Sequence, residues 1–178
     1  MELGLTSPAR QAGFNGEAGE AALFWNQAEL ALNNLRIAVA ARPDSPRLLL
    51  NLGVALLQTN NAAEAVKAFA HVAVSEARRP DALFGWAQAE LASGRFAKSG
   101  QVYEDITRLD RANFRALLGI AEAVAKSGEH DRAALRLLEL LRRAPESQIV
   151  TGRLRLSLIA RGRPFRDATG DSSVAAAD

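Results

Sequence analysis

The sequence predicts an all-α fold in which antiparallel helix pairs follow one another along an α-solenoid. Three observations lead to this prediction. A repeat of 34 residues recurs through the chain, small and large apolar residues hold fixed positions within it, and Gly or Asn recurs where its two helices would join. The clearest copy is the segment 46–79, and other copies begin at residues 12, 80 and 114, with a partial copy from residue 148.

Two positions of the repeat hold small residues in each of the four full copies, which allows paired helices to approach closely. The eighth position holds Gly19, Gly53, Ala87 and Ala121, and the twentieth holds Ala31, Ala65, Ser99 and Ala133. The twenty-fourth position is large and apolar, and it holds Leu35, Phe69, Tyr103 and Leu137. We therefore expect a large side chain to fill the space beside a small one in each repeat.

The fifteenth position marks the turn between the two helices of a repeat. It holds Asn26, Asn60, Gly94, Gly128 and, in the partial copy, Gly162. Gly and Asn tolerate the left-handed backbone conformation that commonly ends a helix. Each repeat therefore consists of a helix, a turn and a second helix.

The ends of the chain are predicted to differ from its middle. Residues 1–11 contain Pro8 and little apolar content, so we expect a flexible N-terminus. The first helix of the first repeat contains Gly13, Gly16 and Gly19, each of which costs about 1 kcal/mol relative to Ala. Residues 163–178 are small and polar and are predicted to form a disordered tail.

The repeat also sets the predicted bounds of the domain and its helices. The domain spans 12–162, with repeats at about 12–45, 46–79, 80–113 and 114–147 and a capping helix at 148–161. After a helix at about 27–41, helices are expected at about 46–58, 62–76, 80–92, 96–108, 113–126, 130–143 and 147–161.

The second repeat holds Leu49, Leu52, Gly53, Ala65 and Phe69 in a characteristic order. With these residues it resembles the tetratricopeptide repeat (TPR) family, whose 34-residue repeat is a pair of helices. The third repeat keeps Leu83, Trp86, Ala87 and Tyr103 but has Glu90 where other repeats have Leu56 and Val124, and the fourth keeps Leu117, Ile120, Ala121, Ala133 and Pro145. The resemblance covers roughly residues 12–162. It implies a right-handed α-solenoid of about four TPR repeats plus a C-terminal capping helix.

The resemblance also implies a binding surface, because the first helices of successive TPR repeats line a concave groove that holds a peptide or a helix. The corresponding residues here are Arg47, Leu50, Asn51, Val54, Asp81, Phe84, Gln88, Arg115, Leu118, Glu122 and Lys126. Leu50, Phe84 and Leu118 would form an apolar ridge, with polar groups at the margins for a peptide backbone. Packing between helices explains Leu50 and Leu118 equally well, so Phe84 is the predicted principal anchor.

Some members of the family clamp a terminal carboxylate with Lys and Asn at set positions of the groove. Only Asn51 matches that pattern here, because Leu50, Val54, Gly85 and Gly119 stand at the other positions. We therefore expect an apolar or helical segment of a partner protein rather than a terminal carboxylate.

Nothing in the sequence predicts an enzyme, a metal site or a cofactor. The chain has no Cys, which excludes disulfides and thiolate chemistry. His71 and His130 share no evident face with each other or with a carboxylate pair, and no phosphate-binding loop or nucleophile elbow is present. We therefore predict no catalytic residue and no small-molecule substrate.

The C-terminal part is rich in arginine although the net charge of the chain is only +2. Arg153, Arg155 and Arg161 interrupt the apolar residues of the last predicted helix, and we call them the basic end. Such a cluster could attract an anionic partner, but a solubilising surface explains it as well. Phe165 is the only interleaved aromatic residue, so binding of nucleic acid or membrane is not expected.

Two functional classes follow. The first is a non-catalytic scaffold or chaperone-like adaptor that binds a partner protein in the groove, for example within a bacterial envelope, pilus or secretion assembly. The second is a self-assembling structural module. The sequence shows no signal peptide and no apolar run long enough to span a membrane, which favours the cytoplasm. A periplasmic or envelope location would require that an export signal had been removed.

Overall fold

The computed structural model describes residues 8–76 and 79–161, and within these ranges it consists of nine α-helices without a strand. The helices are α1 (Pro8–Phe24), α2 (Ala28–Ala41), α3 (Pro46–Gln58), α4 (Ala62–Ser75), α5 (Pro80–Ala92), α6 (Phe96–Leu109), α7 (Phe114–Lys126), α8 (His130–Arg143) and α9 (Gln148–Ala160). The predicted bounds of α2 to α9 agree with these to within one residue at either end. The all-α class and the antiparallel helix pairs are therefore confirmed.

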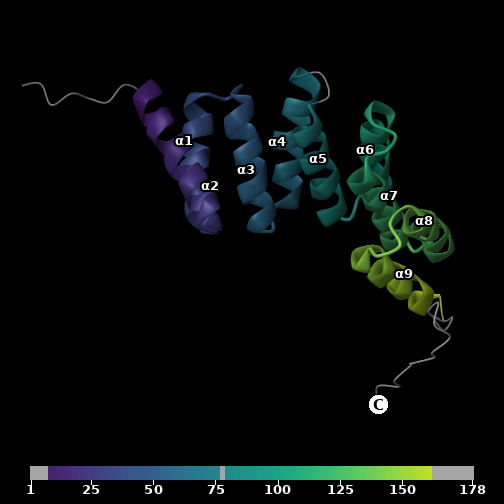
Figure 1. The fold of residues 1–178 in the computed structure, drawn as a ribbon. Helices are drawn as coiled ribbons and strands as arrows, with labels where there is room; N and C mark the ends of the chain where they lie inside the picture. The colour runs from purple at the N-terminus through teal and green to yellow at the C-terminus, as the bar shows by residue number, and fades with distance from the viewer. Residues whose placement is uncertain (1–7, 77–78, 162–178) are drawn as a thin grey trace, which may run out of the picture. The chain divides into compact units, whose positions relative to one another are not determined.

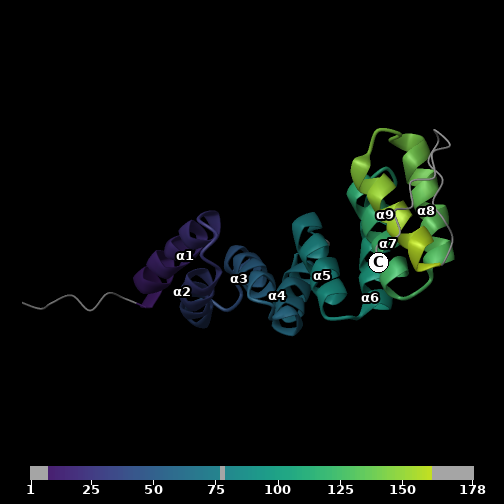
Figure 2. The same ribbon diagram turned by 90° about the horizontal axis from the view of Figure 1, so that it is seen from below.

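The chain divides into two compact parts, an N-terminal unit of residues 1–102 and a C-terminal unit of residues 103–178 (Figure 1). The division falls within α6. In the N-terminal unit the first helices of the pairs, α1, α3 and α5, lie along one side, and the second helices α2 and α4 lie along the other (Figure 2). In the C-terminal unit α7 contacts both α8 and α9. Each unit therefore packs successive pairs, with its first helices in contact.

The helix boundaries have local causes in the sequence. Pro46 and Pro80 occupy the first turn of α3 and α5, where a missing N–H costs nothing. The side chains of Asn113 and Ser147 accept hydrogen bonds from Ala116 N–H and Val150 N–H, which caps α7 and α9. The predicted turn residues Asn26, Asn60, Gly94 and Gly128 all have positive φ. The turn prediction is therefore confirmed, except at Gly162, which lies outside the described residues.

The expected pairing of large and small residues is present in both units. A Cβ atom added at Gly19 would overlap Leu35, and one added at Gly53 or Gly85 would overlap the ring of Phe69. In the C-terminal unit a Cβ at Gly119 would overlap the ring of Tyr103. Each glycine thus provides the space that a large side chain from the neighbouring helix fills.

The first repeat is more regular than its glycines suggested. α1 begins at Pro8, within the range that was expected to be flexible. Further along the helix, Gly16 and Gly19 lie directly against Leu48 and Leu35, so the close approach of helices offsets the propensity cost of glycine. The predicted domain bounds themselves stay a prediction, and the predicted tail at 163–178 lies outside the described residues.

Glu90 departs from the repeat pattern and is buried between two donors. Trp86 Nε1–H donates to Glu90 Oε1 at 2.8 Å, and Arg95 donates to Glu90 Oε2. Only 5% of the Glu90 side chain is exposed, so these partners supply the interactions that a buried carboxylate requires. No helix within the described ranges has the length and apolar character that crossing a membrane requires.

Candidate functional site

An open pocket of about 460 Å³ lies on the first helices of the N-terminal unit. Its lining comes from α1, α3 and the start of α5, with one ring from α4, and consists of Glu20, Leu23, Arg47, Leu50, Asn51, Val54, Phe69, Arg79 and Asp81. We call it the N-terminal pocket. Arg47, Leu50, Asn51, Val54 and Asp81 are positions that the sequence placed in a groove, and the structure brings them together here.

Glu20 joins the two sides of this pocket. Its carboxylate accepts hydrogen bonds from the guanidinium of Arg47 and, at 2.7 Å, from the amide of Asn51, so it links α1 to α3. The hydrogen bond to Glu20 and the charge of Glu20 raise the pKa of the Arg47 guanidinium above its ordinary value. The donors of Arg47 and Asn51 that face this carboxylate are therefore already used.

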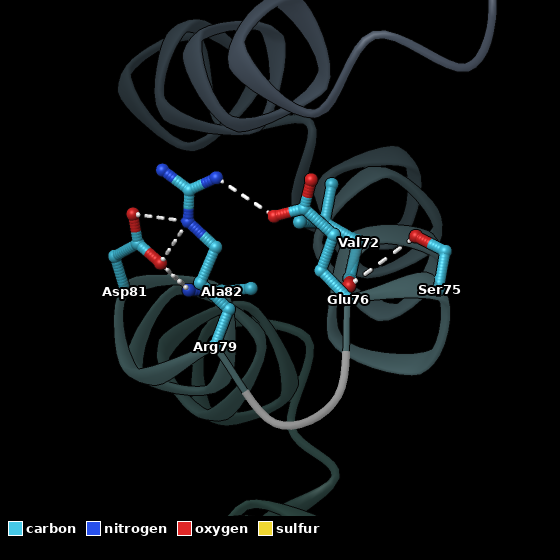
Figure 3. Close-up of polar contacts among 6 residues, drawn as sticks. All are labelled: Val72, Ser75, Glu76, Arg79, Asp81 and Ala82. Atoms are coloured by element: carbon cyan, nitrogen blue, oxygen red, sulfur yellow. Dashed lines mark hydrogen bonds and ion pairs between the residues drawn. The ribbon is translucent and has the colours of Figure 1, made fainter.

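Arg79 makes a second charged cluster at the opposite rim. Figure 3 shows its guanidinium between two carboxylates, with Nε donating to Asp81 at 2.9 Å and Nη1 donating to Glu76 at 2.8 Å. Asp81 also accepts a hydrogen bond from Ala82 N–H at the start of α5. Hydrogen bonds to Glu76 and Asp81 raise the pKa of Arg79 above its ordinary value. The cluster fixes the junction between α4 and α5 with its charges paired.

The floor of the N-terminal pocket is apolar and closely packed. Phe69 is 2% exposed and its ring is held between Gly53 and Gly85. Leu23 and Leu50 are half-buried, whereas Val54 is exposed. The pocket therefore offers an apolar surface framed by two self-paired charged clusters.

A second pocket, of about 240 Å³, lies on the first helices of the C-terminal unit. We call it the C-terminal pocket, and its lining is Ala121, Glu122, Ala125, Lys126, His130, Leu137, Arg153, Leu156, Ser157 and Ala160. Arg153 pairs with Glu122 at 2.6 Å, which links α9 to α7. Within the described part of the chain, the buried Nδ1 of His130 has no hydrogen-bond partner. This pocket is smaller and more apolar than the first.

The two pockets are built from equivalent positions of the repeat. Glu20, Leu23, Asn51 and Val54 correspond, three repeats later, to Glu122, Ala125, Arg153 and Leu156. In each pocket the glutamate of one first helix binds the residue 31 positions later on the next first helix. The repeat thus reproduces one polar link in both units with different partners.

Two further predicted groove residues, Glu122 and Lys126, line the C-terminal pocket, and the other four are not part of either pocket. Phe84 is half-buried and Gln88 is exposed on α5. Arg115 is exposed on α7, whereas Leu118 packs against the buried cluster of the C-terminal unit. Sequence reasoning missed Glu20, Leu23, Phe69 and Arg79. The repeat register could have indicated Glu20, because it occupies the same position as Val54, Gln88 and Glu122.

Much of the predicted basic end is ion-paired. Arg153 binds Glu122 and Arg161 binds Asp131. Arg132 and Arg143 pair with Glu129 and Glu139 within α8 and its preceding turn. The acids that pair with Arg132, Arg153 and Arg161 are Glu129, Glu122 and Asp131, and all three precede Arg132 in the sequence. Acids from outside the arginine-rich C-terminal part therefore neutralise part of its charge.

The described residues contain no group of three His, Asp or Glu side chains that could hold a metal ion. His71 lies 3.4 Å from the exposed carboxylate of Asp44, and His130 lies in the C-terminal pocket. The two pockets present apolar surface between first helices, bordered by polar groups, several of which are already paired. Such a fold and site define a helical-repeat protein.

Comparison with known families identifies which one. The sequence profile of the tetratricopeptide repeat family matches residues 17–83 and 84–148, so the chain belongs to this family. The family generally serves in protein–protein interaction and is typically non-catalytic. Among proteins with curated descriptions, none is significantly similar to this chain.

Solved structures share the fold at low sequence identity. A crystal structure of MamA protein aligns with a TM-score of 0.71 and 14% identity over 85% of this chain and 83% of the other. MamA 41-end from Desulfovibrio magneticus RS-1 aligns with a TM-score of 0.73 and 17% identity, over 85% and 86%. A tetratricopeptide repeat protein from Parabacteroides merdae ATCC 43184 aligns with a TM-score of 0.79 and 14% identity over 89% of this chain and 61% of the other.

Proposed function

We propose that this protein is a non-catalytic scaffold that binds a segment of a partner protein along its first helices. The observation that carries the proposal is the N-terminal pocket, where α1, α3 and α5 bring five predicted groove positions together over an apolar floor. The C-terminal pocket supports it, because the equivalent positions of a later repeat also border an apolar recess. Membership of a family of interaction modules is consistent with this role.

The chemistry of the N-terminal pocket favours an apolar segment as the ligand. Glu20 already accepts from Arg47 and Asn51, so an incoming carboxylate would compete with Glu20 for its donors and be repelled by its charge. Leu50 and Val54 offer surface to aliphatic or aromatic side chains, and the paired charges at the rim can receive backbone groups. A helix or extended strand with apolar anchors fits this surface.

The setting we propose is a bacterial assembly such as an envelope, pilus or secretion complex, in which the protein acts as an adaptor. The structural similarity to proteins from Desulfovibrio magneticus and Parabacteroides merdae supports a bacterial context. We place the protein in the cytoplasm, or at the envelope if an export signal is removed. The proposal includes no catalytic step and no cofactor.

Calorimetric titration against a partner captured from the native host tests the groove. Val54→Asp places a charge on the apolar surface and should weaken binding at least tenfold. Phe84→Ala, which truncates the predicted anchor, should cost on the order of 2 kcal/mol. Val74→Asp is the matched control, because Val74 is 79% exposed on the second helix α4.

The groove proposal fails if Val54→Asp and Phe84→Ala both bind normally while their circular dichroism matches wild type. Arg155→Glu distinguishes the remaining alternative, an anionic partner at the basic end. Loss of binding in Arg155→Glu alone, with Val54→Asp unaffected, would assign the partner to that end instead.

A further inference from the structure

The outer face of α1 is unusually apolar for a protein surface. Phe14 is 72% exposed, Phe24 is 81% exposed and Trp25, one residue beyond the helix, is 71% exposed. Ala21 lies exposed between them along the helix. Figure 1 shows α1 at one end of the N-terminal unit, with the other helices of that unit all to one side. We call Phe14, Ala21, Phe24 and Trp25 the α1 face.

The repeat register shows what this face is equivalent to. Phe14 stands at the third position of the repeat, which holds Leu48, Ala82 and Ala116 in the next three repeats. Ala21 stands at the tenth position, which holds Ala55, Ala89 and Ala123. All six of those residues are buried. They lie on the first helices, and α3 packs against α2 as α5 packs against α4. The α1 face is therefore one half of a junction between helix pairs, uncovered among the described residues.

Two aromatic residues enlarge this half-junction beyond what the repeat requires. The position of Phe24 is occupied in later repeats by Gln58, Ala92 and Lys126. The position of Trp25 is occupied by Thr59, Ser93 and Ser127. The rings of Phe24 and Trp25 pack edge to face with centroids 5.3 Å apart. Since an aromatic side chain offers about 150–250 Å², the three exposed rings present on the order of 400 Å². Joining two such faces, with the residues around them, buries on the order of 1,000 Å², which is enough for a specific interface.

We propose that the α1 face is a homodimer interface in which α1 packs antiparallel against α1 of a second copy. In the described residues the opposite half of the junction is not free, because α2, α4 and α8 already receive α3, α5 and α9. Tyr103 of α6 likewise packs against Gly119 of α7. A second copy can therefore offer its own α1 face to this one, and two-fold dimers are the commonest closed assembly.

The spacing along α1 is self-complementary. A two-fold axis between Glu17 and Ala18 places Phe14 opposite Ala21 of the second copy, so a large side chain meets a small one twice. The same axis places Arg10 opposite Trp25 of the second copy, where a guanidinium can stack on the indole ring. One axis thus accommodates both pairs.

Sedimentation equilibrium over a wide concentration range tests the dimer directly. Wild type should be a dimer, Phe14→Asp should raise its dissociation constant at least tenfold, and Val74→Asp should leave it unchanged. A wild type that is monomeric at millimolar concentration, or that forms species larger than a dimer, overturns the proposal. The proposal is also overturned if Phe14→Asp folds and its dissociation constant equals that of wild type.

The orientation has its own test, which also decides if Phe14→Asp does not fold. Because the chain has no cysteine, Glu17→Cys introduces a single thiol, and it lies beside the proposed axis. Mild oxidation should link Glu17→Cys into a disulfide dimer far faster than Val74→Cys, whose position is also exposed but lies on α4, away from the α1 face. Equal rates for the two variants would overturn the antiparallel arrangement.

Discussion

The N-terminal and C-terminal pockets occupy the same positions of the repeat and yet present different surfaces. In the first, Glu20 binds Asn51 and Arg47, and the floor is the ring of Phe69, held by two glycines. In the second, Glu122 binds Arg153, and Leu156 lies 68% exposed at the position equivalent to Val54. The repeat determines where each side chain lies. The identity of the residue determines whether that side chain is buried and stabilises the fold or is exposed and available for binding.

The largest expected effect distinguishes Phe69, a buried lining residue of the N-terminal pocket, from Leu156, an exposed lining residue of the C-terminal pocket. Phe69→Ala should lower the free energy of unfolding by about 3–5 kcal/mol, because a buried ring leaves a cavity. Leu156→Ala should change it by about 0.5 kcal/mol or less, because the side chain is mostly in water. Chemical denaturation followed by circular dichroism measures both. Similar losses in the two variants would contradict the contrast.

Two helical glycines, Gly85 in the N-terminal unit and Gly152 in the C-terminal unit, should respond in opposite directions. Gly85→Ala should cost about 1–3 kcal/mol of stability, because its methyl group would overlap Phe69 and force repacking. Gly152→Ala is the matched control on α9, where an added Cβ has nothing within 4 Å. It should stabilise the protein by about 1 kcal/mol or less through helix propensity. Destabilisation by Gly152→Ala would show that α9 is more tightly packed than described.

The smallest effect is expected from the polar links. Glu20→Gln and Glu122→Gln should each alter stability less than the glycine substitutions do, because their partners are partly exposed and screened by water. Thermal denaturation at low salt and at 1 M salt provides the measurement. The difference between each variant and wild type should shrink at high salt, and an effect independent of salt would assign these links a packing role instead.

The sequence predicted the helices well because each position of the repeat occurs several times, so its structural role can be inferred from several residues. Asn26, Asn60, Gly94 and Gly128 all mark turns, and no single residue had to carry that assignment. The first helix was predicted less accurately, because helix propensity gives the cost of each glycine but not the helix–helix contact that the glycine permits. Gly16 and Gly19 show that contact with Leu48 and Leu35.

The candidate site was predicted only in part. The register identified Arg47, Leu50, Asn51, Val54 and Asp81, which line one pocket, but not which of them are tied to other residues. The hydrogen bonds of Glu20 and Glu122 join residues on consecutive first helices, and their formation depends on side-chain conformations that spacing alone does not specify. The aromatic α1 face was overlooked because periodicity within one repeat does not reveal which face the neighbouring repeat leaves uncovered.

Site-specific photo-crosslinking in the native host tests the central claim, that the first helices hold a partner protein. A photoreactive residue is placed in turn at Val54, at Leu156 and at Val74, so that both pockets and the second-helix side are sampled under identical conditions. The proposal predicts the same partner band from Val54 and Leu156 and none from Val74. A partner captured from Val74 but from neither pocket position would contradict it.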